Sequence, residues 1–378
     1  MRVMMIAGES SGDLHGAGVV GELLRRDPSC EIIGIGGDRM QAAGMKLVYH
    51  VRELSVMGFW EVLRHLPLLR SVERTMAALV RASRPDAVVL IDYPGFNLRF
   101  ARIARRSTGV RILYYISPQV WAWNRRRVRK MKGLIDKMLV VFPFEEELYR
   151  AEGIDVRFVG HPLLEEIDPE PQDRKGFCTR YGLDPGKQIL GLFPGSRRQE
   201  LERIFPAMLG AARMLYRDRG TQAVVGVAPN FDIEYVRDFL RDDFPVKLIQ
   251  HATYDAMKNS DLALVTSGTA TLETAFFRTP MIVVYRTSAL TYLLGRLLIR
   301  IRNIGLVNIV AGTPIVPEIL QGRVNASTLA GEAAKLLDDA GARSAMSGAL
   351  AVVRERLGTP GASSRVAETI LSIAGRVS

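Results

Sequence analysis

The sequence predicts an α/β protein built from two doubly wound, Rossmann-like domains, each with its own parallel sheet. Short apolar segments with the length of buried strands alternate with helical segments along nearly the whole chain, which is typical of parallel sheets with crossover helices. The alternation is interrupted once, at residues 165–187, where prolines and charged residues concentrate, which predicts a linker, and it then begins again. A length of 378 residues is also large for a single hydrophobic core.

The first half of the chain contains the elements of the first predicted domain. A helix at 14–25 follows the first strand after a turn at 8–13, which does not match G-x-G-x-x-G and so gives no dinucleotide fingerprint. A further helix is expected at 144–151. The expected strands cover residues 3–7, 31–35, 86–91, 111–116, 137–142 and 156–159.

The second half follows the same plan without a short tandem repeat. We expect one domain over residues 1–168 and the other over 187–345, with the last helices, about 346–378, packing back onto the first domain. A helix at 200–216 follows the first strand of the second domain. The expected strands cover residues 188–193, 223–227, 246–249, 262–265 and 281–284.

The composition limits the compartment and the possible partners. A net charge of +11 predicts a surface that attracts nucleic acid, anionic lipid or a phosphorylated substrate. Cys30 and Cys178 have neither disulfide nor metal-ligand spacing, which suits a reducing cytosol. The most apolar stretches, 56–69 and 290–301, are interrupted by charges, so neither is expected to span a membrane. The short apolar run at the N-terminus, with Glu9 soon after, does not predict a signal peptide.

The most informative stretch is a strand–turn–helix junction at 261–273. Its turn of small residues offers unpaired backbone N–H groups at a helix N-terminus, which is where proteins bind phosphate. Glu273 lies about one helical turn further on, and an ionised carboxylate accepts hydrogen bonds from a diol such as a ribose. Together these features describe a nucleotide site, although the turn alone equally fits an ordinary capped helix with a solvated glutamate. The residues expected to contact the nucleotide here are Ser267, Gly268, Thr269, Ala270 and Glu273.

Three acidic residues in the first half lie where expected strands end. Asp92 follows the strand at 86–91, and the carboxyl ends of parallel strands are where such sheets bind ligands. The alternative for Asp92 is a turn-forming residue before Tyr-Pro-Gly. Glu9 and Asp13 lie at the start of the first helix, where its dipole favours carboxylates. Both are candidates for substrate binding, and structural capping explains Asp13 equally well.

Apolar segments flanked by cations predict a surface for lipids. Residues 55–69 hold more apolar side chains than one helical face needs, so they form either core or a helix lying in a membrane surface. A dense basic cluster follows two tryptophans near residue 120. The segment 290–301 is a second candidate for membrane contact. Its alternative role is to pack against a partner subunit, in which case the protein is a homodimer. The residues expected to contact the membrane are Val56, Met57, Phe59, Trp60, Trp121, Trp123, Arg125, Arg126 and Arg127.

Motifs along nearly the whole chain resemble those of the lipid-A-disaccharide synthases. Gly95 departs from the family pattern, since some members are expected to carry an acidic residue there. This weakens the argument for a pair of carboxylates at that place but does not affect the argument for Asp92. The motifs are Ala-Gly-Glu-Ser-Ser-Gly-Asp at 7–13, Val-Met-Gly-Phe at 56–59, Ile-Asp-Tyr-Pro-Gly-Phe-Asn at 91–97, Ser-Pro-Gln-Val-Trp-Ala-Trp at 117–123, Pro-Phe-Glu at 143–145, Val-Gly-His-Pro at 159–162, Phe-Pro-Gly-Ser-Arg at 193–197, Ser-Gly-Thr-Ala-Thr-Leu-Glu at 267–273 and Asn308.

This resemblance implies the B-type glycosyltransferase fold (GT-B), with a nucleotide sugar in the second domain, the acceptor in the first and a cleft between them. It implies an inverting transfer of 2,3-diacylglucosamine from UDP to the 6-hydroxyl of 2,3-diacylglucosamine 1-phosphate. The products are the β-1′,6-linked disaccharide of lipid A biosynthesis and UDP. Both substrates are amphiphiles, so the resemblance also implies a cytoplasmic protein, peripheral on the inner face of the cytoplasmic membrane of a Gram-negative-type bacterium.

The resemblance also suggests roles for individual residues. Asp92 is the candidate base, and Arg197, after Gly195 and Ser196, is the candidate clamp for the diphosphate, with an ordinary surface arginine as the alternative. Asn308 is expected near the uridine or the phosphates. No Asp-x-Asp occurs in the chain, so we expect no metal and no other cofactor, the UDP-sugar being a substrate. His161, near the expected hinge, is more simply explained as structural.

Two other classes of protein are weighed against this interpretation. Another GT-B protein, such as a nucleotide-sugar 2-epimerase or a glycosyltransferase for a different lipid, would share the nucleotide motifs but not those of the acceptor half. A basic nucleic-acid-binding protein is not expected, because the chain has no recognisable binding motif and its positive charge lies beside tryptophans and leucines.

Overall fold

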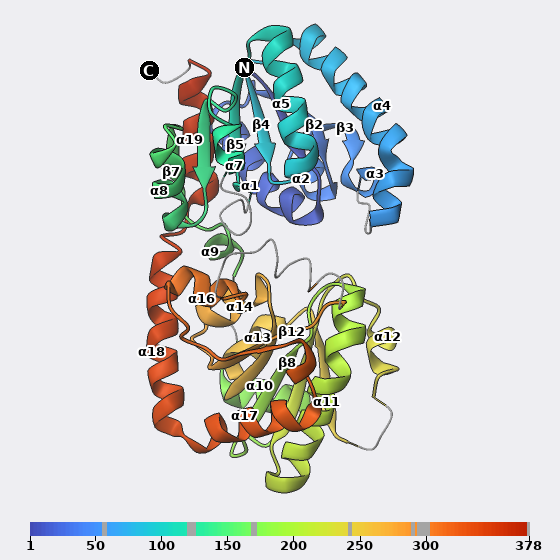
Figure 1. The fold of residues 1–378 in the computed structure, drawn as a ribbon, viewed down its shortest axis with the longest axis vertical. Helices are drawn as coiled ribbons and strands as arrows, with labels where there is room; N and C mark the ends of the chain where they lie inside the picture. Colours follow the sequence, from blue (N-terminus) through green and yellow to red (C-terminus); the bar gives the residue numbers. More distant parts are fainter. Residues whose placement is uncertain are drawn as a thin grey trace. The chain divides into compact units, whose positions relative to one another are not determined.

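The computed structural model describes residues 1–54, 59–118, 126–167, 172–240, 244–288, 292 and 303–375, with the side chains of 59–66, 126 and 127 outside that description. The chain forms two compact units (Figure 1). The first consists of Met1–Glu165 and Leu357–Ser378, and the second of Glu166–Arg356. The chain thus enters the first unit again at Leu357 rather than at about 346, and the stretch expected as a linker contributes helix α10 (Arg174–Tyr181) to the second unit.

The first unit is built on a seven-stranded parallel sheet of order β3-β2-β1-β4-β5-β6-β7. Its central strands are continuous apolar runs, as parallel strands covered on both faces require. The strands are β1 (Arg2–Ala7), β2 (Glu31–Gly36), β3 (Lys46–His50), β4 (Ala87–Ile91), β5 (Arg111–Tyr115), β6 (Lys137–Val140) and β7 (Val156–Phe158). The helices are α1 (Ser10–Arg26), α2 (Asp38–Ala42), α3 (Val51–Leu54), α4 (Phe59–Ser83), α5 (Pro94–Thr108), α7 (Arg126–Arg129), α8 (Pro143–Ala151), α9 (Leu163–Glu166, ending in the second unit) and α19 (Ala362–Ile373).

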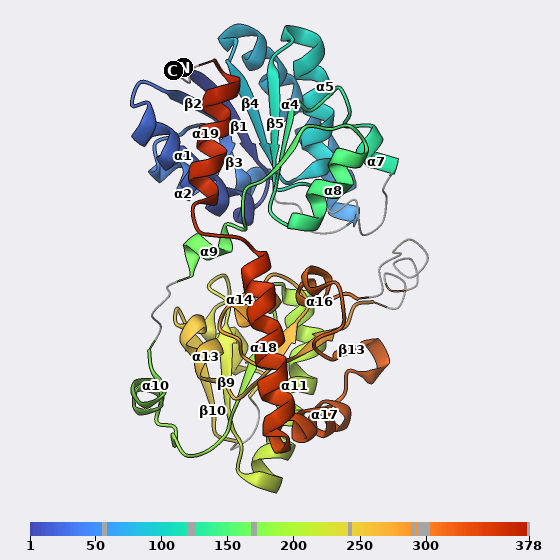
Figure 2. The same cartoon turned by 90° about the vertical axis from the view of Figure 1, so that its left-hand side faces the viewer.

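The strand order of this sheet reverses between β1 and β4. The two strands pair in parallel, with Ala7 opposite Ile91, so their carboxyl ends lie side by side. Such a switch point is where open α/β sheets bind their ligands. The final helix α19, far from β1 in sequence, packs along α1 on one face of this sheet (Figure 2).

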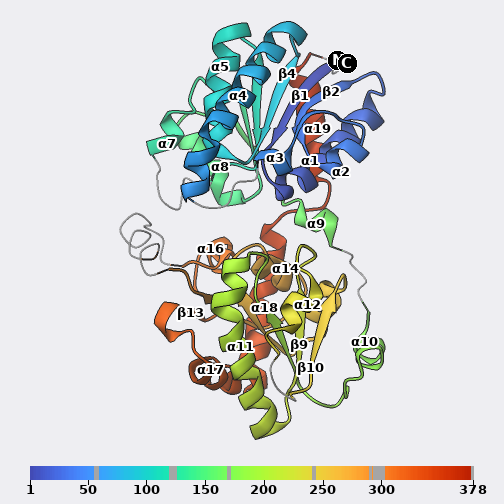
Figure 3. The same cartoon turned by 90° about the vertical axis from the view of Figure 1, so that its right-hand side faces the viewer.

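The second unit has a six-stranded parallel sheet of order β10-β9-β8-β11-β12-β13. Its longest helix on one face, α11, packs along α17 (Figure 3). The strands are β8 (Ile189–Phe193), β9 (Gln222–Val227), β10 (Val246–Gln250), β11 (Leu262–Thr266), β12 (Met281–Tyr285) and β13 (Glu318–Leu320). The other elements are α11 (Arg198–Arg219), α12 (Ile233–Arg237), α13 (Thr253–Asn259), α14 (Ala270–Phe276), α16 (Leu306–Ala311), the 3₁₀ turn η1 (Gln321–Arg323), α17 (Ala326–Asp338) and α18 (Ala340–Arg356).

Strand β11 lies at the centre of the second sheet, between β8 and β12. Val265 pairs with Phe193 on one side and with Val283 on the other. The turns that follow β8, β11 and β12 therefore share one edge of the sheet. These turns contain the segments singled out in the sequence at 195–197 and 267–270.

The predicted fold class, two Rossmann-like α/β domains, is confirmed. Strands β3 and β13, which were not predicted, lie at sheet edges, and β3 includes the polar residues Lys46, Tyr49 and His50. An edge strand pairs on one side only, so its sequence need not be continuously apolar. Among the helices of the described residues, none combines the length and apolar character that crossing a bilayer requires.

Candidate active site

Asp92 lies at the switch point of the first sheet, in a strained and firmly held backbone. Its φ is +44° and that of Tyr93 is +48°, so two consecutive non-glycine residues adopt the left-handed conformation. The Asp92 N–H donates to the Tyr115 carbonyl at 3.0 Å. The Asp92 carbonyl oxygen accepts from the Asn97 side-chain amide at 2.7 Å and from the Tyr114 hydroxyl at 2.6 Å. These three contacts fix the backbone from which the carboxylate projects.

The surroundings of Asp92 make its carboxylate unusually basic. Burial and, next, the charge of Glu9 raise the pKa of Asp92, the Tyr93 N–H and His15 offset part of this rise, and the net value is about 6. Such a carboxyl group is largely ionised at neutral pH and is still a better proton acceptor than an ordinary aspartate, which suits a general base. The sequence pointed to Asp92 but not to Asn97 and Tyr114, which hold its backbone in place.

Glu9 and His161 differ in how far the fold uses their side chains. Glu9 is exposed at the N-cap of α1 and makes no side-chain capping bond, so its carboxylate remains available to a substrate. His161 is buried, its Nδ1 accepts from the Leu163 N–H at 3.2 Å, and its backbone N–H donates to the Leu357 carbonyl at 2.8 Å. Burial lowers the pKa of His161 to about 3, so the ring is neutral at physiological pH. The structural explanation of His161 is therefore the better one.

Asp13 serves the fold rather than a ligand. Its side chain is only 6% exposed, and Oδ1 accepts from the N–H groups of Gly37 at 2.6 Å and Met40 at 3.0 Å. Its Oδ2 accepts from the Arg39 N–H at 3.2 Å. These bonds cap the N-terminus of α2 from outside that helix. The expected contact of Asp13 with substrate is not supported, and its capping role applies to α2 rather than to α1.

Replacement of Asp13 by Ala is expected to lower the free energy of unfolding by about 3 kcal/mol, because three backbone donors lose their acceptor and each buried unpaired donor costs roughly 1–3 kcal/mol. Urea unfolding followed by circular dichroism measures this change. Glu9→Ala is the control, since its exposed side chain makes no capping bond and its loss should cost less than about 0.5 kcal/mol. Equal stability of the two variants would show that the Asp13 cap contributes nothing.

A buried carboxylate anchors the chain just before the segment with the two tryptophans. The Ser117 hydroxyl donates to Glu145 Oε1 at 2.6 Å, and Glu145 Oε2 accepts from the Phe142 N–H at 3.2 Å. The Tyr149 hydroxyl donates to the Pro118 carbonyl at 3.4 Å. The first two residues of Ser-Pro-Gln-Val-Trp-Ala-Trp are thus fixed to α8. This explains the Pro-Phe-Glu motif at 143–145, for which no role was predicted from the sequence.

Most residues expected to contact a membrane lie outside the described part of the chain. Helix α4 begins at Phe59, so part of the apolar segment 55–69 is helical, and its last residues Leu68 and Leu69 pack against the core of the first unit. Outside the described residues, wholly or in their side chains, lie Val56, Met57, Phe59, Trp60, Trp121, Trp123, Arg125, Arg126 and Arg127, and most of 290–301.

In the second unit, the turn after β11 presents a row of free backbone donors. The Ser267 N–H donates to the Val284 carbonyl and the Ser267 hydroxyl to the Ile304 carbonyl, both at 3.0 Å, which fixes the start of the turn. Gly268 has a φ of +155°, a conformation that favours glycine. The N–H groups of residues 268–270 donate to no acceptor within the described part of the chain. Successive free amides of this kind form an anion site.

Glu273 lies in the first turn of α14, close to these amides in sequence. Burial and, next, the charge of Glu166 together raise the pKa of Glu273 to about 7. Its carboxylate accepts no hydrogen bond from a described residue. With a pKa near 7, this carboxyl group is only partly ionised at neutral pH. A ligand that donates hydrogen bonds from hydroxyl groups stabilises the ionised form and is bound more tightly for that reason. This matches the expected contact with a ribose.

The turn after β8 differs from the one after β11, because a carboxylate of its own helix already faces it. Gly195 has a φ of +98°, and a Cβ there would meet the Glu200 carboxylate and the Thr266 methyl group. The Arg197 guanidinium lies 3.6 Å from Glu200 and is 68% exposed. Burial raises the pKa of Glu200, while Arg197 and the N–H groups of Ser196 and Arg197 lower it in part. A phosphate at this turn would compete with Glu200, so the free amides at 268–270 are the better anion site.

Asn308 is wholly used by the fold. It is completely buried, and its amide nitrogen donates to the Val316 carbonyl at 3.0 Å and to Glu318 Oε1 at 2.8 Å. Its oxygen accepts from the N–H groups of Ile315 at 2.9 Å and Val316 at 3.0 Å. The hydrogen-bonding capacity of the amide is thereby filled. The expected contact of its side chain with the uridine or phosphates is not supported, and its role is to hold the loop before β13.

The two parallel sheets with their flanking helices define a class of protein: two-domain, Rossmann-like α/β proteins of the GT-B fold. The UDP-GlcNAc 2-epimerase from Neisseria meningitidis, solved with UDP-GlcNAc, matches with a TM-score of 0.66 at 14% identity, over 98% of this chain and 100% of that one. A protein from Anabaena, solved with UDP and glucose, matches with a TM-score of 0.56 at 13% identity, over 98% and 100% of the two chains. At these identities the likeness shows the fold alone.

Sequence comparison narrows this class to one family. A family model described as lipid-A-disaccharide synthetase matches residues 3–358. The lipid-A-disaccharide synthase of Geobacter metallireducens is 43% identical over 378 residues, which cover 99% of this chain and 98% of the relative. That of Myxococcus xanthus is 40% identical over 374 residues, covering 98% and 97%. The chain belongs to the lipid-A-disaccharide synthase family, and it is a glycosyltransferase that forms the disaccharide of lipid A.

Proposed function

We propose that the protein transfers 2,3-diacylglucosamine from UDP to the 6-hydroxyl of 2,3-diacylglucosamine 1-phosphate, with inversion, to give the β-1′,6-linked disaccharide 1-phosphate and UDP. The observation that carries this proposal is the family match along nearly the whole chain, which includes the acceptor half as well as the nucleotide half. The 2-epimerases share the fold at low identity, and they have no need of an acceptor.

Asp92 acts as the general base in this scheme. It accepts the proton of the acceptor 6-hydroxyl while that oxygen bonds to the anomeric carbon of the donor, on the face opposite the diphosphate. The bond between that carbon and the diphosphate oxygen breaks, and its electron pair leaves with UDP. The raised pKa and the fixed backbone of Asp92 support this role. Glu9, whose charge raises that pKa, remains a candidate for acceptor binding.

The second unit holds the UDP part of the donor. The free amides at 268–270 bind the diphosphate and stabilise the charge that develops on it, and Glu273 accepts hydrogen bonds from the ribose hydroxyls. The exposed Arg197 side chain swings from Glu200 to the diphosphate, which offers it bidentate acceptors. Protein donors thus take the place that a divalent metal has beside an Asp-x-Asp pair, and the reaction needs no metal cofactor.

Product analysis tests this proposal. Mass spectrometry of a mixture of the protein, UDP-2,3-diacylglucosamine and 2,3-diacylglucosamine 1-phosphate, with EDTA present, should show the disaccharide 1-phosphate and UDP. A product that forms only after Mg²⁺ is added back would disprove metal independence but keep the transfer. Conversion of the UDP-sugar to its 2-epimer, without disaccharide, would contradict the proposed transfer.

The protein works at the surface of the membrane that contains its amphiphilic substrates. Apolar residues near the start of α4, the two tryptophans and the basic residues after them support this location, on the cytoplasmic face of the inner membrane. A homodimer through residues 290–301 is the alternative use of the second apolar segment.

Replacement of Phe59 and Trp60 together by Ser should release the folded protein from anionic vesicles, because the membrane then loses two apolar anchors. Sedimentation with vesicles containing phosphatidylglycerol measures the bound fraction. The control is Tyr216→Ser with Val352→Ser, which removes two exposed apolar side chains from the second unit. A folded Phe59/Trp60 variant that still sediments like the wild type would show that this helix does not bind the membrane.

A further inference from the structure

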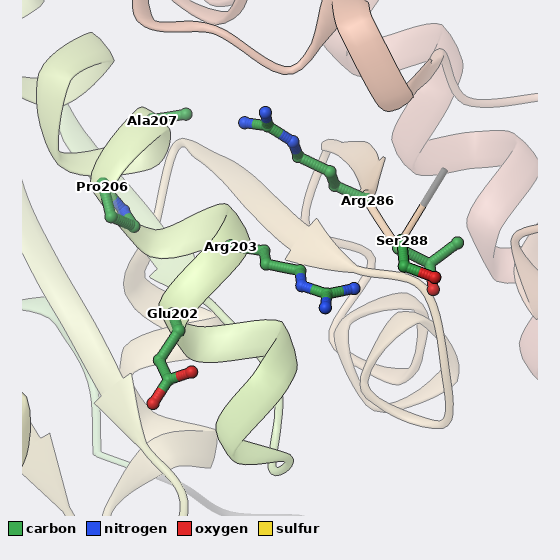
Figure 4. Close-up of a pocket in the computed structure, with 7 residues that line it drawn as sticks. Glu202, Arg203, Pro206, Ala207, Arg286 and Ser288 are labelled. Atoms are coloured by element: carbon green, nitrogen blue, oxygen red, sulfur yellow. The ribbon is translucent and has the colours of Figure 1, made fainter. Parts of the chain in front are cut away.

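A cavity of about 410 Å³ lies in the second unit, apart from the residues proposed to bind the nucleotide. One wall is a side of α11, with Glu202, Arg203, Pro206 and Ala207, and the other is the segment after β12, with Arg286 and Thr287 (Figure 4). No residue at 195–197 or 267–273 lines it. The cavity is therefore a separate place where a ligand can bind.

Two arginines line this cavity, and within the described part of the chain neither forms an ion pair. Figure 4 shows that Arg203 extends from α11 toward the segment after β12, and that Arg286 extends from that segment toward α11. Neither forms an ion pair with a described residue, whereas other arginines of α11 do. Those pairs are Arg198 with Glu202, Arg217 with Asp218 and Arg219 with Asp338. Arg203 thus differs from Arg198, Arg217 and Arg219 of its own helix, and Arg286, in the segment after β12, likewise has no ion pair among the described residues.

The single carboxylate of the cavity is already bound by other groups. Glu202 Oε1 accepts from Arg198 Nε at 2.9 Å and from the Tyr235 hydroxyl at 3.0 Å. The Arg198 hydrogen bond, together with that of Tyr235, holds the pKa of Glu202 below its usual value. The charge of Arg203 also contributes to this lowering, although the hydrogen bonds of Glu202 go to Arg198 and Tyr235. Two arginines beside one carboxylate give the lining residues a net positive charge.

The donors fit an oxyanion with acceptors on several sides. Guanidinium groups bind phosphate through parallel hydrogen bonds, and two of them on opposite walls suit a tetrahedral group better than a planar carboxylate. The Thr287 hydroxyl adds a neutral donor. Ligand pockets usually measure roughly 300–1,000 Å³, so this cavity also admits the small group that carries the phosphate. Pro206 and Ala207 give that group an apolar surface.

We propose that Arg203 and Arg286 form a binding site for the phosphate group of an anionic lipid, outside the nucleotide site. The choice of a lipid rests on the proposed function, while the phosphate chemistry rests on the cavity alone. Two lipids carry this chemistry: the sugar 1-phosphate acceptor and a membrane phospholipid.

Titration calorimetry with glucosamine 1-phosphate, at saturating UDP, tests the site without any need for activity. The wild type should bind one equivalent, and Arg203→Gln with Arg286→Gln should weaken this binding tenfold or more. Arg217→Gln with Arg237→Gln is the control of equal charge, since both arginines pair with carboxylates outside the cavity. The UDP affinity should be unchanged in both variants. Absence of wild-type binding, equal binding by both variants, or an equal loss of UDP affinity in the cavity variant would overturn the proposal.

Two further measurements identify the lipid. If the acceptor binds here, the cavity variant should show a KM for detergent-solubilised acceptor at least tenfold higher, an unchanged kcat and normal sedimentation with vesicles. If a phospholipid binds here, the variant should instead lose binding to phosphatidylglycerol vesicles and keep its KM. A variant unaltered in both measurements would contradict a lipid ligand. Absence of transfer in the wild type would refute the proposed function and leave the calorimetric result intact.

Discussion

The Asp92→Asn variant is expected to lose turnover by a factor of about 100 to 10,000, the usual contribution of a positioned general base. Asn keeps the size of the side chain and tolerates the left-handed backbone at this position, so the geometry of the turn should survive. UDP should bind the variant with wild-type affinity, because Asp92 belongs to the first unit and the proposed nucleotide contacts to the second. Initial rates of disaccharide formation and titration with UDP measure the two properties.

The raised pKa of Asp92 gives this variant a second signature. In the folded protein the carboxyl group titrates at about 6, above its ordinary value of about 3.8, so folding becomes less favourable as the pH rises between these values. Asn carries no charge, so the free energy of unfolding of the variant lacks this pH-dependent loss. The variant should therefore be more stable than the wild type at pH 8 and equally stable near pH 3. In the wild type, kcat/KM should rise with pH through about 6. Near-normal turnover of Asp92→Asn would remove Asp92 from the mechanism.

The Glu273→Gln variant should bind uridine and UDP about 10- to 100-fold more weakly, because hydrogen bonds to a charged acceptor contribute roughly 1.5–3 kcal/mol. Wild-type affinity for uridine should also fall as the pH drops from 8 to 6, since burial and Glu166 raise the pKa of Glu273 to about 7 and only the ionised form accepts from both ribose hydroxyls. Uridine is the better probe for this series because it has no phosphate that titrates in the same range.

Two controls belong to the uridine titration. Glu332→Gln removes a carboxylate that pairs with Lys335 at 3.1 Å on α17, and it should leave affinity and pH dependence unchanged. Glu166→Gln should move the midpoint of the pH dependence to lower pH, because one of the two causes of the raised pKa of Glu273 is gone. A Glu273→Gln variant with wild-type affinity across this pH range would refute the ribose contact.

The fold could be predicted because its main signals are local. Buried parallel strands such as β4 and β11 are short apolar runs, and the turns after them are visible in the residues that follow. The partners that support Asp92 could not be predicted in the same way. Tyr114 reaches the Asp92 carbonyl only because β5 pairs with β4, a neighbour relation that the sequence alone does not specify.

The same limit explains the candidates that the structure assigns to the fold. In a sequence motif, an acidic or amide residue that binds a ligand cannot be distinguished from one that caps a distant helix or loop. Asp13 accepts hydrogen bonds from backbone N–H groups at the start of α2, and Asn308 accepts them from the loop before β13. These contacts depend on which chain segments the fold brings beside each residue. Glu200 is a related case. Its carboxylate faces the turn at 195–197, which the sequence predicted as a phosphate-binding turn. Motif membership therefore points to regions of the chain but does not specify the role of each side chain.

A crystal structure of the protein with UDP tests the central claim most directly: that the second unit binds the nucleotide through a run of unpaired amides and the half-buried Glu273. We predict diphosphate oxygens within about 3.2 Å of the N–H groups at 268–270 and ribose hydroxyls at similar distances from the Glu273 carboxylate. UDP bound elsewhere, with these amides and Glu273 still without a ligand, would contradict the account.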